Sequence, residues 1–172
     1  MITTTALALV LLGTQDSMTP PFPKAELDAI KFLTGNYRGK GTSHDQAGNI
    51  VKTTGSSQGR MEFGHWLSMN ADYTMPGTPK MNGRFMLTYN TMSQKYEGTW
   101  FDNMTQQPLN CKGKFEGDYL VLWSDPMTIA PGVPPAIFKI VYRKSGARSY
   151  DFRLRIKMAD QWSPIMDMSY AR

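Results

Sequence analysis

The segment YDFRLRIK, residues 150–157, alternates apolar and polar side chains without interruption. Successive side chains of a β-strand point to opposite faces of a sheet, so this order places the apolar side chains on one face and the charged ones on the other. An antiparallel sheet with one face on a core and one in water has this pattern. The segment therefore predicts an antiparallel strand with one buried face.

Short runs of the same kind, separated by glycine, proline, asparagine and serine, extend over residues 34–172. They predict about ten strands. The predicted strands are residues 36–44, 49–62, 65–75, 81–90, 94–102, 108–115, 118–124, 136–143, 149–158 and 161–171. Turn-forming residues lie at 76–79, 90–93, 116–118 and 144–146, and the longest irregular stretch is 125–135. Strands about a dozen residues apart, with no second helix, favour a closed antiparallel meander over a sandwich with crossovers.

One helix is expected ahead of the strands. Residues 23–33, PKAELDAIKFL, begin with proline and glutamate in the opening turn and place Leu27, Ile30 and Leu33 three residues apart. This pattern predicts an amphipathic helix of about three turns that ends at Gly35. A short helix in this position can close one end of a barrel.

The first residues suggest export. Residues 6–12, ALALVLL, form an apolar run that is long enough for a signal peptide and too short to span a bilayer. We expect a signal peptide at 1–17, a flexible N-terminus at 18–23 and a single barrel domain at 24–172, with a periplasmic or extracellular location. The alternative is that the run packs on the domain as a short helix or strand.

The composition excludes several classes of function. The single cysteine, Cys111, rules out an intramolecular disulfide framework and a thiolate zinc site, and two histidines leave little for a metal centre, so no cofactor is expected. The net charge is +5, but the densest basic group, Arg153, Arg155 and Lys157, fits a solvated strand face, and no nucleic-acid partner is expected. No nucleophile elbow, phosphate-binding loop, dinucleotide fingerprint or zinc-protease helix is present.

Alternate residues of the predicted strands form apolar sets that would face one interior. The sets are Leu67, Met69 and Tyr73; Met81, Phe85, Leu87 and Tyr89; Tyr96 and Trp100; Phe138, Ile140 and Tyr142; and Trp162, Met166 and Tyr170. Buried tyrosine and tryptophan need polar partners, so this interior is expected to hold hydrogen-bonding groups or water. Methionine, with 13 copies, suits either a packed core or an adaptable apolar cavity. A small barrel is either fully packed or holds one small ligand, and both alternatives stay open.

The order of several short motifs resembles a known family. The motifs are residues 32–39 (FLTGNYRG), 83–85 (GRF), 89–90 (YN), 95–102 (KYEGTWFD) and 166–172 (MDMSYAR). Together they resemble the bacterial domain of unknown function 1579, from about Leu27 to the end of the chain, and the most specific part is Tyr-x-Gly-x-Trp-x-Asp at 96–102. The resemblance implies a calycin-like, lipocalin-like β-barrel, often preceded by a signal peptide, and no established activity.

Two related barrel families add expectations. Residues 35–37, GNY, resemble the Gly-x-Trp start of lipocalin-like barrels, in which a late arginine packs over the aromatic ring. This implies that Arg172 or Arg143 covers Tyr37 in a structural role. The nitrobindins bind haem through a late histidine, whereas the last histidine here is His65. Haem binding would therefore need His65 from a different strand, and it ranks below the other functions.

These observations lead to one preferred function and two alternatives. The preferred function is non-enzymatic binding of a small apolar or amphipathic molecule inside the barrel, with Arg84 or Asp102 near a mouth to fix a polar end. The expected ligand-binding residues are Met69, Arg84, Phe85, Tyr89, Tyr96, Trp100, Asp102, Tyr142 and Tyr170. The first alternative is an enzyme that uses the same cavity with Asp102 as acid and base. The second is a packed structural or protein-interaction module.

Overall fold

The computed structural model describes residues 21–45 and 47–172. The expected signal peptide at 1–17 lies outside the described residues, as do residues 18–20 of the expected flexible segment. No helix in the described part of the chain is long and apolar enough to cross a bilayer.

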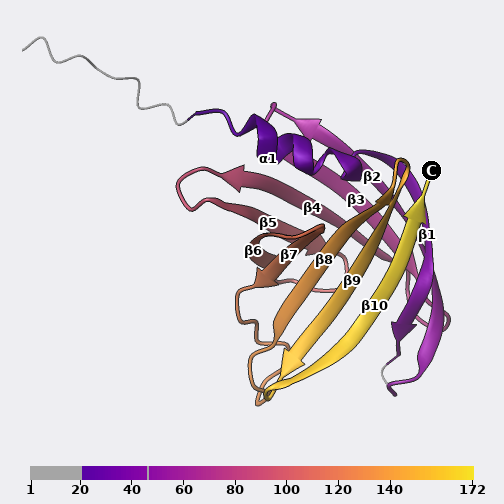
Figure 1. The fold of residues 1–172 in the computed structure, drawn as a ribbon. Helices are drawn as coiled ribbons and strands as arrows, with labels where there is room; N and C mark the ends of the chain where they lie inside the picture. Colours follow the sequence, from indigo (N-terminus) through magenta and orange to yellow (C-terminus); the bar gives the residue numbers. More distant parts are fainter. Residues whose placement is uncertain (1–20, 46) are drawn as a thin grey trace, which may run out of the picture.

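The described chain forms a closed barrel of ten antiparallel strands with a short helix at its N-terminal end (Figure 1). The strands are β1 (Gly35–His44), β2 (Ile50–Glu62), β3 (Trp66–Thr74), β4 (Met81–Asn90), β5 (Lys95–Asp102), β6 (Leu109–Glu116), β7 (Tyr119–Ser124), β8 (Ile137–Gly146), β9 (Ser149–Met158) and β10 (Gln161–Ala171). Each strand pairs with the next, and β1 pairs with β10 to close the barrel. The predicted all-β meander of about ten strands is confirmed.

The helix is shorter than predicted. The α-helix α1 covers only Lys24–Ala29, and a 3-10 turn, η1, follows at Lys31–Leu33. Residues three apart are eclipsed in a 3-10 turn, so the tighter winding keeps Ile30 and Leu33 pointing in the same direction. Leu27, Ile30 and Leu33 are all almost completely buried. The need to bury these three side chains over the barrel end therefore outweighs the continuation of a regular α-helix.

Two irregularities in strand pairing change the predicted pattern. The β8 strand continues to Gly146, with a register shift after Lys144, so the turn lies at 147–148 and not at 144–146. A second shift between Pro164 and Met166 inserts one extra residue into β10. Because a β-bulge reverses the alternation beyond it, Trp162 lies on the outer face and not in the predicted inner set.

The barrel wall closes around Tyr37. The Arg172 guanidinium lies 4.6 Å from the centre of the Tyr37 ring and donates a hydrogen bond to the Thr34 carbonyl. Gly35 is required there, because its φ is +105° and a Cβ would come within 2.5 Å of the Arg172 Nη2 atom. The expectation that Arg172 covers this ring is confirmed, while Arg143 instead pairs with Asp151 at 2.6 Å.

Candidate functional site

The two ends of the barrel differ in how well they are covered. The closed end lies under α1 and η1, where the Tyr96 hydroxyl donates to the Glu26 carbonyl at 2.8 Å and the Tyr37 hydroxyl donates to the Phe32 carbonyl at 2.6 Å. The opposite end, called the open end below, carries residues 47–49 and the loops at 75–80, 103–108, 125–136 and 159–160. Figure 1 shows that α1 crosses one end of the barrel only.

Inward-facing apolar side chains at the open end are only partly covered. We call Met81, Trp100, Leu109 and Leu154 the open rim; all four are half-buried and pack against the core. Apolar side chains of the closed end, such as Met61 and Phe115, are half-buried too, but α1 and η1 lie over that end. A solvent-accessible apolar surface inside a barrel mouth is the kind of surface that small ligands use.

Trp100 is held in the open rim from two sides. Its indole lies over Gly83 of β4, where a Cβ would overlap the ring, and its Nε1–H donates to Asp102 Oδ2 at 2.7 Å. The ring centre lies 6.4 Å from that of Tyr73. The motif at 96–102 therefore connects the two ends, because Tyr96 bonds to the helix and Trp100 forms part of the rim.

Asp102 organises the turn that follows β5. Its Oδ1 accepts hydrogen bonds from the backbone amides of Met104 and Thr105, both at 2.8 Å, and its other oxygen accepts the Trp100 indole. A carboxylate bonded in this way closes an Asx turn and fixes the neighbouring ring. These hydrogen bonds give Asp102 a structural role: it holds the turn after β5 and the Trp100 ring in place.

Replacement of Asp102 by alanine is expected to lower the free energy of unfolding by about 2 kcal/mol, because it removes charge-assisted bonds to the indole and the turn. Asparagine keeps an acceptor, so we expect Asp102→Asn to lose less than half of that amount. Urea unfolding of both variants measures the difference. An Asp102→Asn protein of unchanged stability that loses turnover of a substrate would favour the enzyme alternative instead.

Four tyrosines form a buried group in the interior, called the tyrosine cluster below: Tyr73, Tyr142, Tyr150 and Tyr170. The rings of Tyr150 and Tyr170 stack with centres 4.7 Å apart, and that of Tyr142 lies 6.2 Å from Tyr150. Tyr150 shares a 2.6 Å hydrogen bond with the Ser57 hydroxyl. The Tyr170 hydroxyl is buried beside the Tyr73 hydroxyl, but the contact between them does not have the geometry of a well-formed hydrogen bond.

Burial keeps these phenols neutral. It raises the pKa of Tyr73 to about 12, and it raises the pKa values of Tyr142, Tyr150 and Tyr170 well above the ordinary value. Burial also raises the pKa of the Cys111 thiol to about 12. At neutral pH the cluster therefore offers O–H donors and no charge, and the thiol is a poor nucleophile.

The structure places the predicted ligand-binding residues in five different surroundings. Met69, Phe85 and Tyr142 lie in the fully buried centre, where the Phe85 and Tyr142 rings are 6.3 Å apart. Tyr89 and Tyr96 meet edge to face at the closed end, with centres 5.1 Å apart. Trp100 and Asp102 lie at the open end, and Tyr170 belongs to the tyrosine cluster. Arg84 is the exception, because it is on the outer face of β4.

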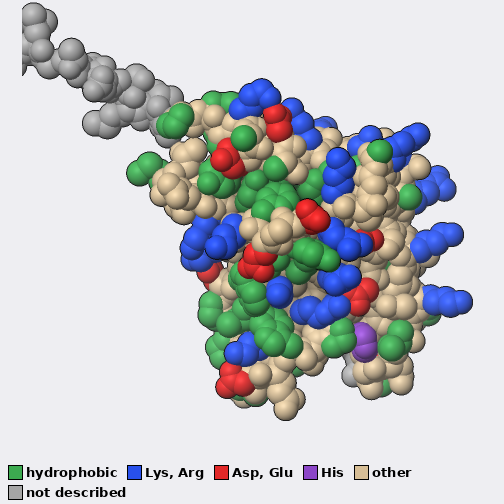
Figure 2. All heavy atoms as spheres, viewed as in Figure 1, with side chains coloured by type: hydrophobic (Ala, Val, Ile, Leu, Met, Phe, Trp, Pro, Cys, Tyr) green, Lys and Arg blue, Asp and Glu red, His purple; other side chains and the backbone are tan. Residues whose placement is uncertain are grey.

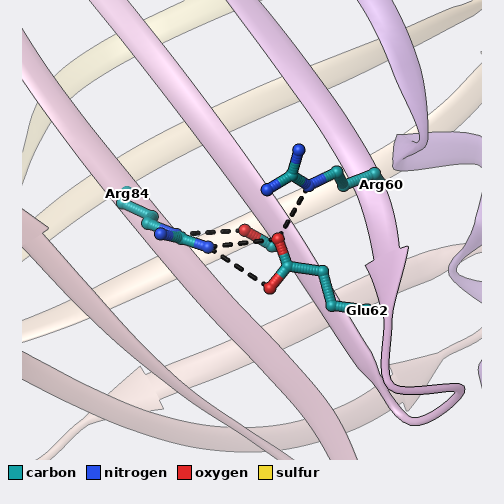
Figure 3. Close-up of polar contacts among 4 residues, drawn as sticks. Arg60, Glu62 and Arg84 are labelled. Atoms are coloured by element: carbon teal, nitrogen blue, oxygen red, sulfur yellow. Dashed lines mark hydrogen bonds and ion pairs between the residues drawn. The ribbon is translucent and has the colours of Figure 1, made fainter.

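Arg84 takes part in an ion network outside the barrel (Figure 3). Its guanidinium lies 3.1 Å from Glu62 Oε1 and donates to the Ser68 hydroxyl at 3.1 Å. Arg60 bonds to the same carboxylate at 2.7 Å and holds the pKa of Glu62 below its usual value. Arg84 is therefore a surface residue that links β2, β3 and β4, and it does not reach the interior.

The histidine needed for the haem alternative lies away from the interior. His65 is exposed on the turn between β2 and β3, at the closed end, where its ring meets Phe22 edge to face at 5.0 Å. It has no path into the tyrosine cluster from this turn. Axial ligation of the nitrobindin kind does not fit this placement.

Several residues of the site were not among the predicted ligand-binding residues. Tyr73, Met81 and Leu154 were placed on buried faces by alternation, but alternation does not separate the open rim from the packed centre. Tyr150 lies in the segment that decides the fold, and its partner Ser57 is 93 residues away in the chain. Only the strand pairing brings these groups together.

Two surface hollows lie on the outer face of the barrel. The larger, of about 600 Å³, is lined by polar residues of β1, β2 and β3, among them Arg38, Gln58 and Asp72. The smaller, of about 290 Å³, lies over β7, β8 and β9, with Val121 and Val141 beside Lys139 and Arg153. Most of their lining residues are on the outer face, but Tyr37 and Ser57, which also line the larger hollow, contact Tyr150 of the tyrosine cluster.

The closed ten-stranded meander with one end under a helix defines a calycin-like β-barrel protein. The chain belongs to the DUF1579 family, a family of proteins of unknown function, whose model matches residues 23–172. This confirms the resemblance given by the sequence motifs. No curated protein matches the sequence of the chain.

Two solved structures share the barrel fold at low sequence identity. The Rv2717c protein of M. tuberculosis is 13% identical, with a TM-score of 0.62, and the match covers 86% of this chain and 96% of that one. The S-type phycobiliprotein lyase CPES of Guillardia theta is 11% identical, with a TM-score of 0.55, and the match covers 89% of this chain and 98% of that one. At these identities the likeness concerns the fold alone.

Proposed function

We propose that the protein binds a small, uncharged, largely apolar molecule through the open end of the barrel. The observation that carries the proposal is the Tyr170 hydroxyl, which is buried beside the Tyr73 hydroxyl without a well-formed hydrogen bond. A buried polar group without a partner costs roughly 1–3 kcal/mol, so a ligand that supplies an acceptor recovers this energy. The half-buried apolar side chains of the open rim provide contacts for the rest of the molecule.

The chemistry of the interior specifies the ligand class. The tyrosine cluster holds neutral phenols, which donate hydrogen bonds to a carbonyl or hydroxyl oxygen. Asp102, the charged side chain that touches the open rim through Trp100, is already bonded to the Trp100 indole and the 102–105 turn. A charged ligand would therefore be desolvated without an opposite charge, whereas a neutral molecule carrying one oxygen acceptor fits.

We place this binding activity outside the cytoplasm, on the basis of the apolar run at 6–12. The mass of the mature protein recovered from its own host tests this placement, because cleavage by signal peptidase removes the run. Native mass spectrometry of the same sample tests the ligand. A mass excess that disappears on unfolding supports binding and gives the mass of the retained molecule.

Removal of the Tyr170 hydroxyl distinguishes its role in ligand binding from its effect on the stability of the empty protein. We expect Tyr170→Phe to raise the free energy of unfolding of the empty protein by about 1 kcal/mol, because it removes a buried polar group without a well-formed hydrogen bond. The same change is expected to weaken binding of Nile red, a neutral aromatic carbonyl compound, by about fivefold. Urea unfolding and fluorescence titration measure the two effects.

Tyr89→Phe is the control, because the Tyr89 ring packs on Tyr96 and belongs neither to the tyrosine cluster nor to the open rim. It is expected to leave Nile red affinity unchanged. Equal affinity of the wild-type and Tyr170→Phe proteins for Nile red, together with a clean apo mass from the host, would overturn the proposal and favour a packed barrel.

A further inference from the structure

An exposed apolar patch lies beside the open end, on the side formed by β7 to β10. It comprises Trp123, Ile129, Val133 and Trp162, which we call the tryptophan patch; each is between 36% and 46% exposed. The residues come from the ends of β7 and β10 and from the 125–136 loop, which all belong to the open end. Figure 2 shows hydrophobic and basic side chains interleaved over this side of the barrel.

The two tryptophans form a fixed outward pair. Their ring centres lie 5.4 Å apart at 66°, and the Lys139 ammonium lies 4.7 Å above the Trp123 ring. Trp162 faces outward only because the β10 bulge reverses the alternation after Pro164. The bulge therefore leaves a large aromatic side chain exposed beside Trp123, and the two rings form apolar surface that the core does not use.

The charge beside the patch is positive. Of the basic residues on the outer face of β8 and β9, Arg155 pairs with Asp167, Lys157 with Asp160 and Arg143 with Asp151. Lys139 and Arg153 have no carboxylate within ion-pair distance in the described part of the chain. These two cations line the hollow over β7 to β9, next to the tryptophans.

We infer that the tryptophan patch docks the open end onto an anionic lipid bilayer. Tryptophan prefers the interface between lipid and water, lysine and arginine attract anionic headgroups, and aliphatic side chains enter the acyl boundary. The contact would place the open rim against the membrane, so that an apolar ligand moves between bilayer and barrel without crossing water. The docking stands on the patch alone, while this role for it rests on the proposed function.

Single-stranded nucleic acid fits the same surface less well. Base recognition requires aromatic faces that are free to stack successive bases, along a basic groove. Here the two rings pack against each other at 66°, Lys139 covers a face of Trp123, and Ile129 and Val133 offer no stacking surface. The aliphatic residues favour the bilayer.

The test is co-sedimentation of the full chain with vesicles of equal parts phosphatidylcholine and phosphatidylglycerol, compared with phosphatidylcholine alone. We expect binding to the anionic vesicles that weakens as salt is added. Trp162→Ser is expected to weaken it by about fivefold or more. Trp66→Ser is the matched control, since Trp66 is 39% exposed but lies at the closed end, and it should leave binding unchanged.

Charge is tested in the same way. Lys139→Glu is expected to weaken vesicle binding by about fivefold for each unit of charge changed. Lys40 is exposed on β1, away from the tryptophan patch. Lys40→Glu makes the same change in net charge and should have little effect on vesicle binding. The inference is overturned by absence of binding to anionic vesicles at low salt, by equal losses in the matched pairs, or by a single-stranded oligonucleotide that binds more tightly than vesicles.

Nile red titration without vesicles tests the interior binding site independently of membrane docking, so the failure of one proposal can be distinguished from the failure of the other. If vesicle binding fails while Nile red affinity still depends on Tyr170, docking is wrong and the proposed ligand binding stands. If vesicles bind through Trp162 but Nile red affinity is independent of Tyr170, docking stands and the interior site is wrong.

Discussion

Replacement of Gly83 by alanine is expected to destabilise the barrel by about 2 kcal/mol, because the new methyl group occupies the space of the Trp100 ring. Alanine is favoured over glycine in a strand by roughly 0.5–1 kcal/mol, which offsets only part of this cost. The displaced indole also loses its hydrogen bond to Asp102, worth about 1 kcal/mol or more. The midpoint of urea unfolding measures the net change.

A double-mutant cycle identifies the cause. In a Trp100→Ala protein the ring is absent, so Gly83→Ala is expected to cost nothing or to stabilise slightly. A Gly83→Ala cost that is the same with and without the indole would contradict the contact between the two residues. Because Trp100 belongs to the open rim, Gly83→Ala is also expected to weaken Nile red binding.

Replacement of Leu33 by alanine is expected to lower the free energy of unfolding by about 3 kcal/mol. Leu33 is 0% exposed, and it packs with Ile30 and Leu27 under the 3-10 turn at the closed end. The Leu33 carbonyl also lies directly over Gly59 of β2, so the backbone there has little room to collapse into a cavity. Such a site retains most of the cavity left by the shorter side chain.

Ile129→Ala is the control for Leu33→Ala, since Ile129 is 46% exposed, and it should change stability by less than about 0.5 kcal/mol. Unfolding of the Leu33→Ala protein is followed by tryptophan fluorescence and by circular dichroism. Coincident transitions show that the closed end unfolds with the barrel. A loss of helix signal at low urea, ahead of the barrel transition, would mean that the helix unfolds independently of the barrel.

Most of the fold was predictable because the deciding pattern is local. Strand β9 was predicted at 149–158 and is found at Ser149–Met158, since its alternation has the period of an extended chain and its buried face is continuous. The break of the helix at Ile30 was not predictable in the same way. The spacing of Leu27, Ile30 and Leu33 fits both an α-helix and a 3-10 turn, and the barrel surface beneath them decides between the two.

The candidate site was predictable as a set of inner faces but not as an arrangement. Met69, Phe85 and Tyr142 were expected to line a ligand and lie in the fully buried centre, and Arg84 points outward to Glu62. Alternation assigns a side chain to a face, but it does not give the depth of that side chain along the barrel. Depth depends on the stagger between neighbouring strands, which is a property of the whole sheet.

The sequence by itself determined the class of the protein: a pattern of period two, which each segment carries independently, predicts the strands, their buried faces and the barrel, and the short motifs identify the family. Only the tertiary structure decided that Trp162 faces water, because this depends on one inserted residue in the pairing of β10 with β9. It likewise decided that the Tyr170 hydroxyl lies buried without a well-formed hydrogen bond among phenols from β3, β8 and β9. Both features arise from contacts between strands far apart in the chain, and no local pattern records them.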